Sequence, residues 1–263
     1  MVDSTLPATP DVPESVYLDL QAALGITKHM GGMTSTEELA DRCHIEPGKK
    51  VLDVGCGTGK TPCYLASTHG CSVIAVDINR SMLSRSRERA RRERLGDSVR
   101  FELADAQNLP YDDCHFDVIL CESVTAFVGD KAKAIGEYAR VVKPRGYIGL
   151  NETTWVREPP PARVVEYVFH TTGARPETAR VWQEMLGKAG LRNPESEVHE
   201  VTMLSEWVSE MKWLDMRDLL GPWFRLIPQY LANADTRRFV RTLWPAPSEY
   251  FEYFGYGLYT ARK

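Results

Sequence analysis

The stretch 51-VLDVGCGTGKT-61 decides the fold of this chain. It joins a short apolar run to three glycines at alternate positions, Gly55, Gly57 and Gly59. In α/β proteins, a buried strand that ends in a glycine-rich turn and leads into a helix is a common binding site for a nucleotide-like ligand. The spacing of the glycines indicates which ligand this turn holds.

The spacing argues against two familiar nucleotide loops. The phosphate-binding loop G-x-x-x-x-G-K-[ST] needs a glycine at the position of Val54. The dinucleotide loop G-x-G-x-x-G needs one at the position of Lys60. An acidic residue, Asp77, nevertheless ends the next apolar run, about 20 positions after the first glycine, where ribose recognition requires it. The pattern therefore favours an adenosine-type ligand without a pyrophosphate.

The composition of the 263 residues fits a globular protein, with 43% hydrophobic and 26% charged residues and a formal net charge of −4. This charge does not favour binding to nucleic acid or anionic lipid over the whole surface, so no nucleic-acid partner is expected. Residues 84–94 hold six arginines, which we expect to form a solvent-exposed helix face supported by the Glu88 and Arg92 pair. A local contact with RNA or anionic membrane is the alternative.

No run of 18 apolar residues occurs, so no transmembrane segment is expected, and residues 1–15 lack the features of a secretory signal. The six cysteines form neither a C-x-x-C pair nor a zinc-site spacing. We therefore expect reduced thiols, a cytoplasmic location and no metal. The sequence leaves the oligomeric state open.

Strand-like and helix-like segments alternate along residues 46–155, which we expect to form the cofactor-binding core. Strands are expected at 50–55, 71–78, 99–106, 116–123 and 147–155, and helices at 61–70, 80–96 and 130–146. This alternation predicts a doubly wound, Rossmann-like α/β fold with helices on both faces of the sheet. We expect seven strands, mostly parallel, with an antiparallel last strand.

The remaining segments complete this plan. Residues 1–45 are expected to be an N-terminal lead and helices that cover the cofactor site, with a helix start near Thr36. Residues 156–203 should supply a further helix and strand of the core with a lid excursion. Residues 204–249 are too long for a plain loop and should form an inserted helical lid, and residues 250–263 should form the final strand.

Several stretches in a fixed order resemble the class I S-adenosylmethionine-dependent methyltransferases. D-V-G-C-G-T-G resembles the first motif of that family, and VIAVDINRSML resembles its second element. LADAQNLPYDDCHFDVILCESV resembles the third and fourth elements. YARVVKPRGYIGLNE resembles the fifth, where K-P-G-G is commoner and Arg145 replaces the first glycine. The resemblance covers about residues 30–155 and the last strand, and it extends to the small-molecule subgroup that contains quinone-biosynthesis C-methyltransferases.

This resemblance implies S-adenosylmethionine as the cofactor. Asp53 would then face the ammonium of the methionine part, Asp77 the ribose diol and Asp105 the adenine edge, while Ile78 and Met82 would pack on the adenine faces. The glycines would let the backbone approach the cofactor closely. The full set of implied cofactor-binding residues is Asp53, Gly55, Cys56, Gly57, Thr58, Gly59, Asp77, Ile78, Met82, Asp105, Ala106 and Cys121.

The methyl acceptor is expected above the carboxyl ends of the fourth and fifth strands. Glu122 and Glu152 follow these strands and could bind a cationic acceptor or remove a proton from it, or could instead cap backbone amides. His29 is a further candidate base. The expected acceptor contacts are Trp155, His170 and Trp213.

Aromatic residues crowd the segment 204–256, which favours a planar or apolar small-molecule acceptor. Methyl transfer from a sulfonium is an in-line displacement, in which positioning supplies most of the acceleration. We therefore expect a methyltransferase that acts on a small acceptor. The alternatives left open are an NAD-type oxidoreductase, an RNA or protein methyltransferase, a binding module without turnover, and an arsenite methyltransferase that uses Cys121.

Overall fold

The computed structural model describes residues 29–201, 227, 228, 230–232, 234, 236, 237 and 246–263. Most of the predicted lid, including Trp213, therefore lies outside the described residues. Among the described helices, none is long and apolar enough to cross a membrane.

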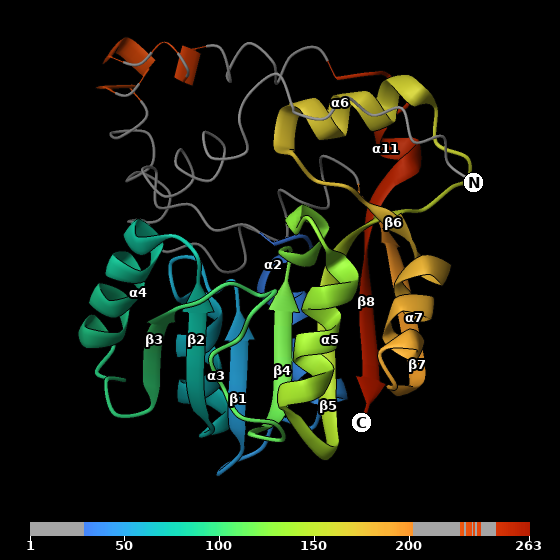
Figure 1. Ribbon diagram of the computed structural model, residues 1–263. Coiled ribbons are helices and arrows are strands. Elements are labelled where there is room, and N and C mark those ends of the chain that lie inside the picture. The colour runs from blue at the N-terminus through green and yellow to red at the C-terminus, as the bar shows by residue number, and fades with distance from the viewer. Residues whose placement is uncertain (1–28, 202–226, 229, 233, 235, 238–245) are drawn as a thin grey trace.

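One sheet organises the described part of the chain, with the strand order β3-β2-β1-β4-β5-β8-β7 (Figure 1). The strands β1 to β5 are parallel, and β8 is antiparallel to both β5 and β7. The strands are β1 (Lys50–Val54), β2 (Ser72–Asp77), β3 (Val99–Leu103), β4 (Phe116–Glu122), β5 (Val142–Trp155), β7 (Arg192–Glu200) and β8 (Phe254–Arg262). A two-residue strand, β6 (Glu177–Thr178), pairs with β5 outside this order. The predicted mostly parallel sheet with an antiparallel last strand is confirmed. The prediction counted seven strands, whereas the described residues form eight, because the short β6 adds one beside β5.

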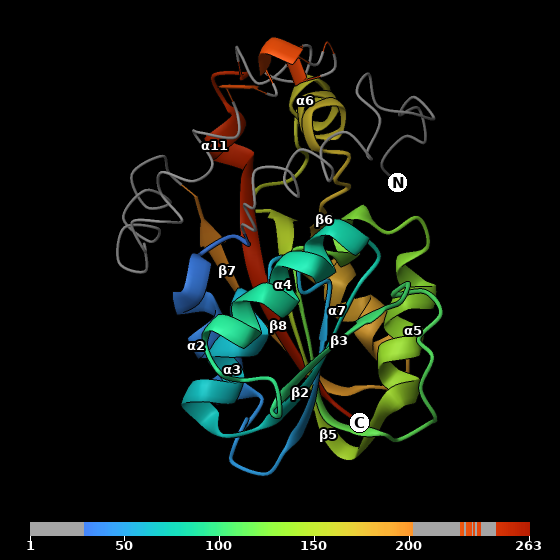
Figure 2. The same ribbon diagram turned by 90° about the vertical axis from the view of Figure 1, so that its left-hand side faces the viewer.

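Helices cover both faces of the sheet, which confirms the doubly wound, Rossmann-like arrangement. One face carries α2 (Gly32–Arg42), α3 (Lys60–His69) and α4 (Arg80–Arg92), and the other carries α5 (Lys131–Val141) and α7 (Ala179–Lys188) (Figure 2). The helix α6 (Ala162–Thr172) and the short α11 (Tyr250–Tyr253) lie above the sheet on the side of β5 and β8, and α11 leads directly into β8 (Figure 1).

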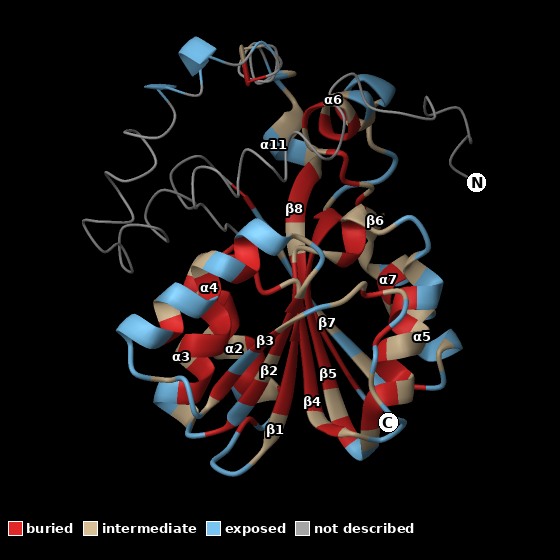
Figure 3. Cartoon of the chain, turned by 60° about the vertical axis from the view of Figure 1, so that its left-hand side comes forward, coloured by how far each residue is buried: buried red, intermediate tan, exposed pale blue. Residues whose placement is uncertain are grey.

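Alternate residues of each strand are buried in two separate cores, one on each face of the sheet. Leu52 and Val54 belong to the core that includes residues of α5 and α7, whereas Val51 and Leu120 belong to the core under α2, α3 and α4. Figure 3 shows that buried residues fill the strands and the inward faces of the helices. The parity of a residue in its strand therefore decides which face its side chain reaches.

Several predicted boundaries are wrong. The predicted helix 130–146 ends at Val141, and the strand expected at 147–155 already begins at Val142. The helix expected to start near Thr36 starts at Gly32, because the chain turns at Gly31 with a φ of 72°. The predicted helix 80–96 ends at Arg92. Residues 250–253 form a helical turn instead of strand, in which the Tyr250 ring packs against Tyr167 and Phe254.

Candidate cofactor and acceptor site

A cavity of about 490 Å³ lies where β1, β2 and β4 end. This volume falls within the range of roughly 300–1,000 Å³ that is usual for small-molecule pockets. The structure brings most of the predicted cofactor residues into its lining, together with two of the candidate catalytic residues. These lining residues are Asp53, Gly55, Cys56, Gly57, Asp77, Ile78, Met82, Asp105, Ala106, His29 and Glu122.

The other predicted residues lie elsewhere. Within the glycine turn, Gly59 faces α4, because a Cβ added there would lie 2.6 Å from the Cβ of Ser86. Trp155 is buried against Phe254, and His170 lies on α6. The predicted residues that do not line this cavity are Thr58, Gly59, Cys121, Glu152, Trp155 and His170.

The turn that follows β1 depends on its glycines. Gly55, Gly57 and Gly59 have φ values of 76°, 53° and 79°, in the left-handed region that favours glycine. A Cβ added to Gly55 would lie 2.1 Å from the Cγ2 of Val124. The turn is fixed to β2 because the Gly55 amide donates to the Val76 carbonyl at 2.8 Å. The first and last glycines therefore allow close packing, and the turn presents backbone to the cavity.

Asp53 is a buried carboxylate without a complete set of partners. It is 2% exposed, and its Oδ2 has no hydrogen-bond partner among the described residues. Burial, followed by the nearby charges of Glu122 and Asp77, raises its pKa well above the usual range. Because an unpaired buried charge is costly, Asp53 fits a ligand that brings a cationic group into the cavity.

Asp77 ends β2 and orients both the glycine turn and the chain that follows it. Its Oδ2 accepts a hydrogen bond from the Gly57 amide at 2.9 Å, and its Oδ1 accepts one from the Asn79 amide at 2.8 Å. Burial raises the pKa of Asp77, and these backbone hydrogen bonds oppose that effect. Each carboxylate oxygen can accept a second hydrogen bond, so Asp77 can receive two hydroxyl groups of a diol.

The remaining wall combines one carboxylate with apolar surface. Asp105 accepts a hydrogen bond from the Gln107 amide at 2.8 Å, which fixes its orientation. Ile78 is 65% exposed although it is apolar, and Met82 lies buried in the same lining. These side chains offer apolar surface to a planar group of a ligand.

Glu122 is the centre of a buried hydrogen-bond network in the cavity. The Thr36 hydroxyl donates to its carboxylate at 3.0 and 3.1 Å, and the Thr61 hydroxyl donates to its Oε2 at 2.9 Å. The Nε2 of His29 lies 3.0 Å from the Thr36 Oγ1 and 3.7 Å from the Glu122 Oε1. The sequence prediction missed Thr36 and Thr61. Thr36 could have been found because threonine is unfavourable inside a helix, so its presence there indicates that its hydroxyl makes a specific hydrogen bond.

Ser123 turns the chain immediately after Glu122. Its φ is 56°, a strained value for a residue other than glycine, and its amide donates to the Asn151 carbonyl at 2.6 Å. Its hydroxyl is buried without a partner among the described residues, and the residue lines the cavity. Strain of this kind concentrates at functional sites.

Glu152 occupies a different environment, on the side of the sheet that carries α5. Its Oε1 accepts hydrogen bonds from the Val124 and Thr125 amides at 3.2 and 2.6 Å, and its Oε2 accepts one from the Ala126 amide at 3.1 Å. Burial raises its pKa, and these hydrogen bonds oppose that effect. Glu152 thus caps the short 3-10 helix η1 (Thr125–Phe127), the amide-capping alternative that the sequence left open.

The thiols do not favour the thiolate chemistry of an arsenite enzyme. Burial raises the pKa of Cys43 and of Cys63 to about 12. It raises the pKa of Cys121 further, and the Cys121 sulfur faces Thr125 and Tyr138 instead of the cavity. Cys56 lines the cavity, but burial and the charge of Asp53 raise its pKa as well.

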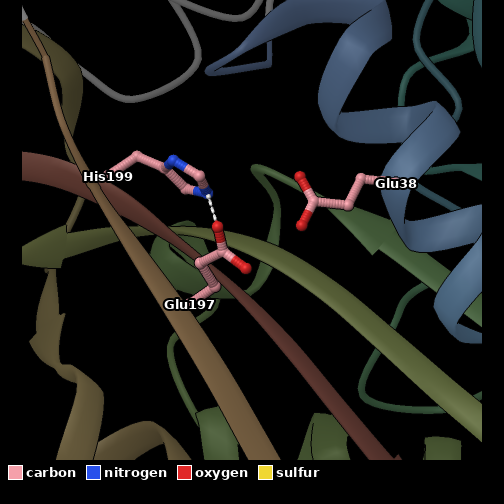
Figure 4. Close-up of side chains that lie close together, drawn as sticks. All are labelled: Glu38, Glu197 and His199. Carbon is pink, nitrogen blue, oxygen red and sulfur yellow. Dashed lines mark ion pairs between the residues drawn. The ribbon is translucent and has the colours of Figure 1, made fainter.

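A second polar cluster lies between α2 and β7, outside the cavity lining (Figure 4). Glu38, Glu197 and His199 place ligand-type atoms within 4.8 Å of one another. The Arg42 guanidinium contacts both carboxylates, at 2.5 Å from Glu38 Oε1. The His199 ring stacks on Tyr256, 4.7 Å between centroids. The Arg42 guanidinium already supplies the positive charge that a metal ion would bring to these carboxylates. We therefore interpret the cluster as a clamp that holds α2 against β7.

Comparison with known proteins agrees with this geometry. The family described as "Methyltransferase domain" matches residues 52–150, which run from β1 into β5. The matched segment contains the glycine turn and the strand ends that carry Asp77, Asp105 and Glu122.

Three curated relatives illustrate the range of similar sequences. The chain is 40% identical over 119 residues to the methyltransferase GfsG of Streptomyces halstedii, an alignment that covers 45% of this chain and 43% of GfsG. It is 32% identical to phosphoethanolamine N-methyltransferase 1 of Arabidopsis thaliana, over 61% of this chain and 32% of that protein. It is 30% identical to an uncharacterized protein of Haemophilus influenzae, over 70% of this chain and 75% of that protein. The chain thus spans less than half the length of the first two relatives.

Solved structures share the fold over nearly the whole chain. The (4+2)-cyclase SpnF has a TM-score of 0.78 with 22% identity, and the match covers 99% of both chains. A methyltransferase from Geobacter sulfurreducens in complex with S-adenosyl-L-homocysteine has a TM-score of 0.71 with 21% identity, over 93% of this chain and 96% of that one. Since these neighbours differ in the activity that they are named for, the fold alone does not assign the reaction.

Proposed function

Since the chain belongs to the class I S-adenosylmethionine-dependent methyltransferases, we propose that its cavity binds S-adenosylmethionine and that the protein methylates a small-molecule acceptor. When bound, this cofactor supplies an electrophilic methyl group on a sulfonium centre. The chain supplies binding, orientation and exclusion of water. The single observation that carries the proposal is the buried Oδ2 of Asp53 in the cavity lining, which has no hydrogen-bond partner in the part of the chain that the structure describes.

The charge of the lining supports this cofactor over a dinucleotide. Asp53, Asp77, Asp105 and Glu122 place four carboxylates in the lining. S-adenosylmethionine brings a sulfonium and an ammonium to these carboxylates, and opposite charges attract strongly where water is excluded. A pyrophosphate would bring further negative charge to the same place. This argues against the NAD-type oxidoreductase.

The proposed roles follow the position of each residue. Asp53 holds the ammonium, and Asp77 accepts hydrogen bonds from the ribose hydroxyls, each worth roughly 1.5–3 kcal/mol. Asp105 and the backbone that follows it recognise the adenine edge. Ile78 and Met82 cover the two faces of the adenine ring.

The acceptor is a small molecule with an apolar or ring-shaped part. Val124, Phe127 and Val128 give the cavity an apolar wall beside Glu122, which supports such a molecule. The acidic lining argues against RNA, because an RNA phosphate would be repelled there. The free cysteines fit a reducing compartment such as the cytoplasm.

Two measurements test the proposal. Calorimetry with S-adenosylhomocysteine should give a dissociation constant in the micromolar range or below, and NAD should give no heat of binding. Incubation of the protein with a metabolite extract and a donor labelled in its methyl group should yield a labelled small molecule, to be identified by mass spectrometry. Binding of NAD without binding of S-adenosylhomocysteine would overturn the proposal, and so would label that stays in the donor with every extract fraction.

A further inference from the structure

We infer that His29, Thr36 and Glu122 form a relay that prepares His29 as a general base, and that the acceptor therefore carries a hydroxyl or N–H group. The inference rests on the proposed methyl transfer and adds the chemical class of the acceptor to it. We name this set of three residues the His29 relay.

The hydrogen bonds fix where the proton of His29 lies. The hydroxyl of Thr36 has one proton, and it donates that proton to Glu122. The same oxygen lies 3.0 Å from the Nε2 of His29, so it can only accept a hydrogen bond there. Nε2 must therefore carry a proton. In the neutral ring, Nδ1 then keeps a free lone pair, and a general base needs such a lone pair to accept a proton.

The carboxylate of Glu122 also lies close to the His29 ring itself. When Nδ1 takes up a proton, the ring becomes positive, and the Glu122 Oε1 lies 3.7 Å from Nε2. The side chain of Glu122 is only 4% exposed, so water screens this attraction weakly. A carboxylate that orients a histidine and stabilises its cation is the logic of a catalytic triad, with a threonine inserted between the two groups.

Surrounding contacts hold the relay in place before an acceptor arrives. Thr61 donates to Glu122 from α3 and so fixes the carboxylate from a second helix. The Asn151 side chain donates to the Met30 carbonyl at 2.8 Å, which anchors the chain next to His29. Positioned groups of this kind need no reorganisation during the reaction. This arrangement favours catalysis over a purely structural role.

The step that the His29 relay serves balances in atoms and electrons. The oxygen or nitrogen of the acceptor forms a bond to the methyl carbon, and the carbon–sulfur bond breaks with its electron pair left on sulfur. The proton of the acceptor passes to the Nδ1 of His29 and from there to solvent. A thioether or a tertiary amine carries no such proton and would leave the relay without a use.

Nitrogen-15 NMR on protein labelled in its six histidines tests the tautomer directly. The His29 signals are identified by their loss in His29→Gln. We expect the Nε2–H tautomer in the wild type, in Thr36→Ser and in Thr68→Val, a matched substitution at an exposed helical threonine. In Thr36→Val the preference should be lost. An Nδ1–H tautomer in the wild type, or an unchanged tautomer in Thr36→Val, would overturn the inference, and the wild-type result stands even if a variant fails to fold.

Turnover and cofactor binding separate this inference from the proposed function. General base catalysis is typically worth about 10²–10⁴-fold, so Thr36→Val should lower kcat at least tenfold while Thr36→Ser recovers most of it. S-adenosylhomocysteine should bind all variants within about twofold of the wild type. Failure of the wild type to bind it would defeat the proposed function and leave the tautomer result intact. A labelled product with its new methyl group on carbon or sulfur, or on a nitrogen that carried no proton, would overturn the acceptor class.

Discussion

Glu122 and Glu152 lie near the ends of the paired strands β4 and β5, yet their carboxylates reach opposite faces of the sheet. Glu122 pairs in register with Asn151, so Glu152 is one position further along β5 and points to the other side. Glu122 meets threonines of α2 and α3, whereas Glu152 meets the backbone of η1. Two carboxylates at the ends of neighbouring strands therefore have different hydrogen-bond partners on opposite faces of the sheet.

Glu152→Gln should destabilise the fold without a matching loss of cofactor affinity. The glutamine side chain keeps one oxygen acceptor and places an NH₂ group against a backbone amide that Glu152 now satisfies. An unsatisfied buried amide costs about 1–3 kcal/mol. Urea unfolding checks this, with Glu184→Gln on the exposed face of α7 as the control. Unchanged stability of Glu152→Gln would contradict the capping role.

Asp53→Asn should stabilise the free protein and weaken cofactor binding. The substitution removes a buried carboxylate whose pKa is raised by burial and by Glu122. A gain of about 1 kcal/mol would raise Tm by roughly 2–4 °C, and affinity for S-adenosylhomocysteine should fall at least tenfold. Thermal melting and calorimetry give the two numbers. A variant that binds as tightly as the wild type would remove Asp53 from the site.

The raised pKa of Asp53 also sets a pH dependence. A carboxyl group whose pKa is higher in the folded than in the unfolded state favours folding below the unfolded value, and that contribution is lost as pH rises through the folded value. The Tm advantage of Asp53→Asn should therefore be larger at pH 8 than at pH 5. Since a bound ammonium favours the ionised form, cofactor binding to the wild type should release a proton. Calorimetry in buffers of different ionisation enthalpy measures this release, which should be absent in Asp53→Asn.

Gly55→Ala should cost more stability than Gly48→Ala. Both glycines have a positive φ, 76° and 81°, so both variants carry the backbone cost of about 1–2 kcal/mol. The added Cβ would meet Val124 at 2.1 Å in the first case and nothing within 4 Å in the second. Overpacking should add about 1–3 kcal/mol at Gly55. If urea unfolding shows the same loss of unfolding free energy for both variants, Val124 moves aside without a measurable cost.

Asp77→Asn should weaken binding of S-adenosylhomocysteine at least tenfold, which corresponds to about 1.4 kcal/mol. The asparagine keeps the shape of the side chain but loses its charge and one of the two acceptors that orient Gly57 and Asn79. Calorimetry measures the change, and Asp112→Asn in an exposed turn serves as the control. Wild-type affinity in Asp77→Asn would refute its role at the ribose.

The local pattern of the sequence was enough to predict the sheet and to bring most of the proposed cofactor residues to one cavity. The glycine spacing at Gly55 and the acidic residue Asp77 at the end of the next strand report on short-range geometry, because each lies at a strand end that the apolar runs mark. Parallel strands bring such ends to one edge. The cavity therefore gathered most of the predicted cofactor residues.

The acceptor side was harder to predict because it depends on contacts between distant segments. Thr36 donates a hydrogen bond to Glu122, 86 positions away in the sequence, and no local pattern predicts that contact. Strand parity could have separated Glu122 from Glu152, since Glu122 shares the face of Leu120 and Glu152 that of Leu150. The helix start near Thr36 was misplaced for the same reason, since its hydroxyl serves Glu122 and caps no helix.

The clamp between α2 and the C-terminal strands has a consequence for the order of assembly during synthesis. Ser35 bonds to Tyr256 across 221 positions, and Arg42 contacts Glu197. On the ribosome, the glycine turn and its neighbouring strands can assemble while the last strands are still being translated. The contacts of Ser35 and Arg42 with the late strands form only after those strands have emerged. A nascent chain can thus form the proposed donor site before α2 makes its contacts with the last strands.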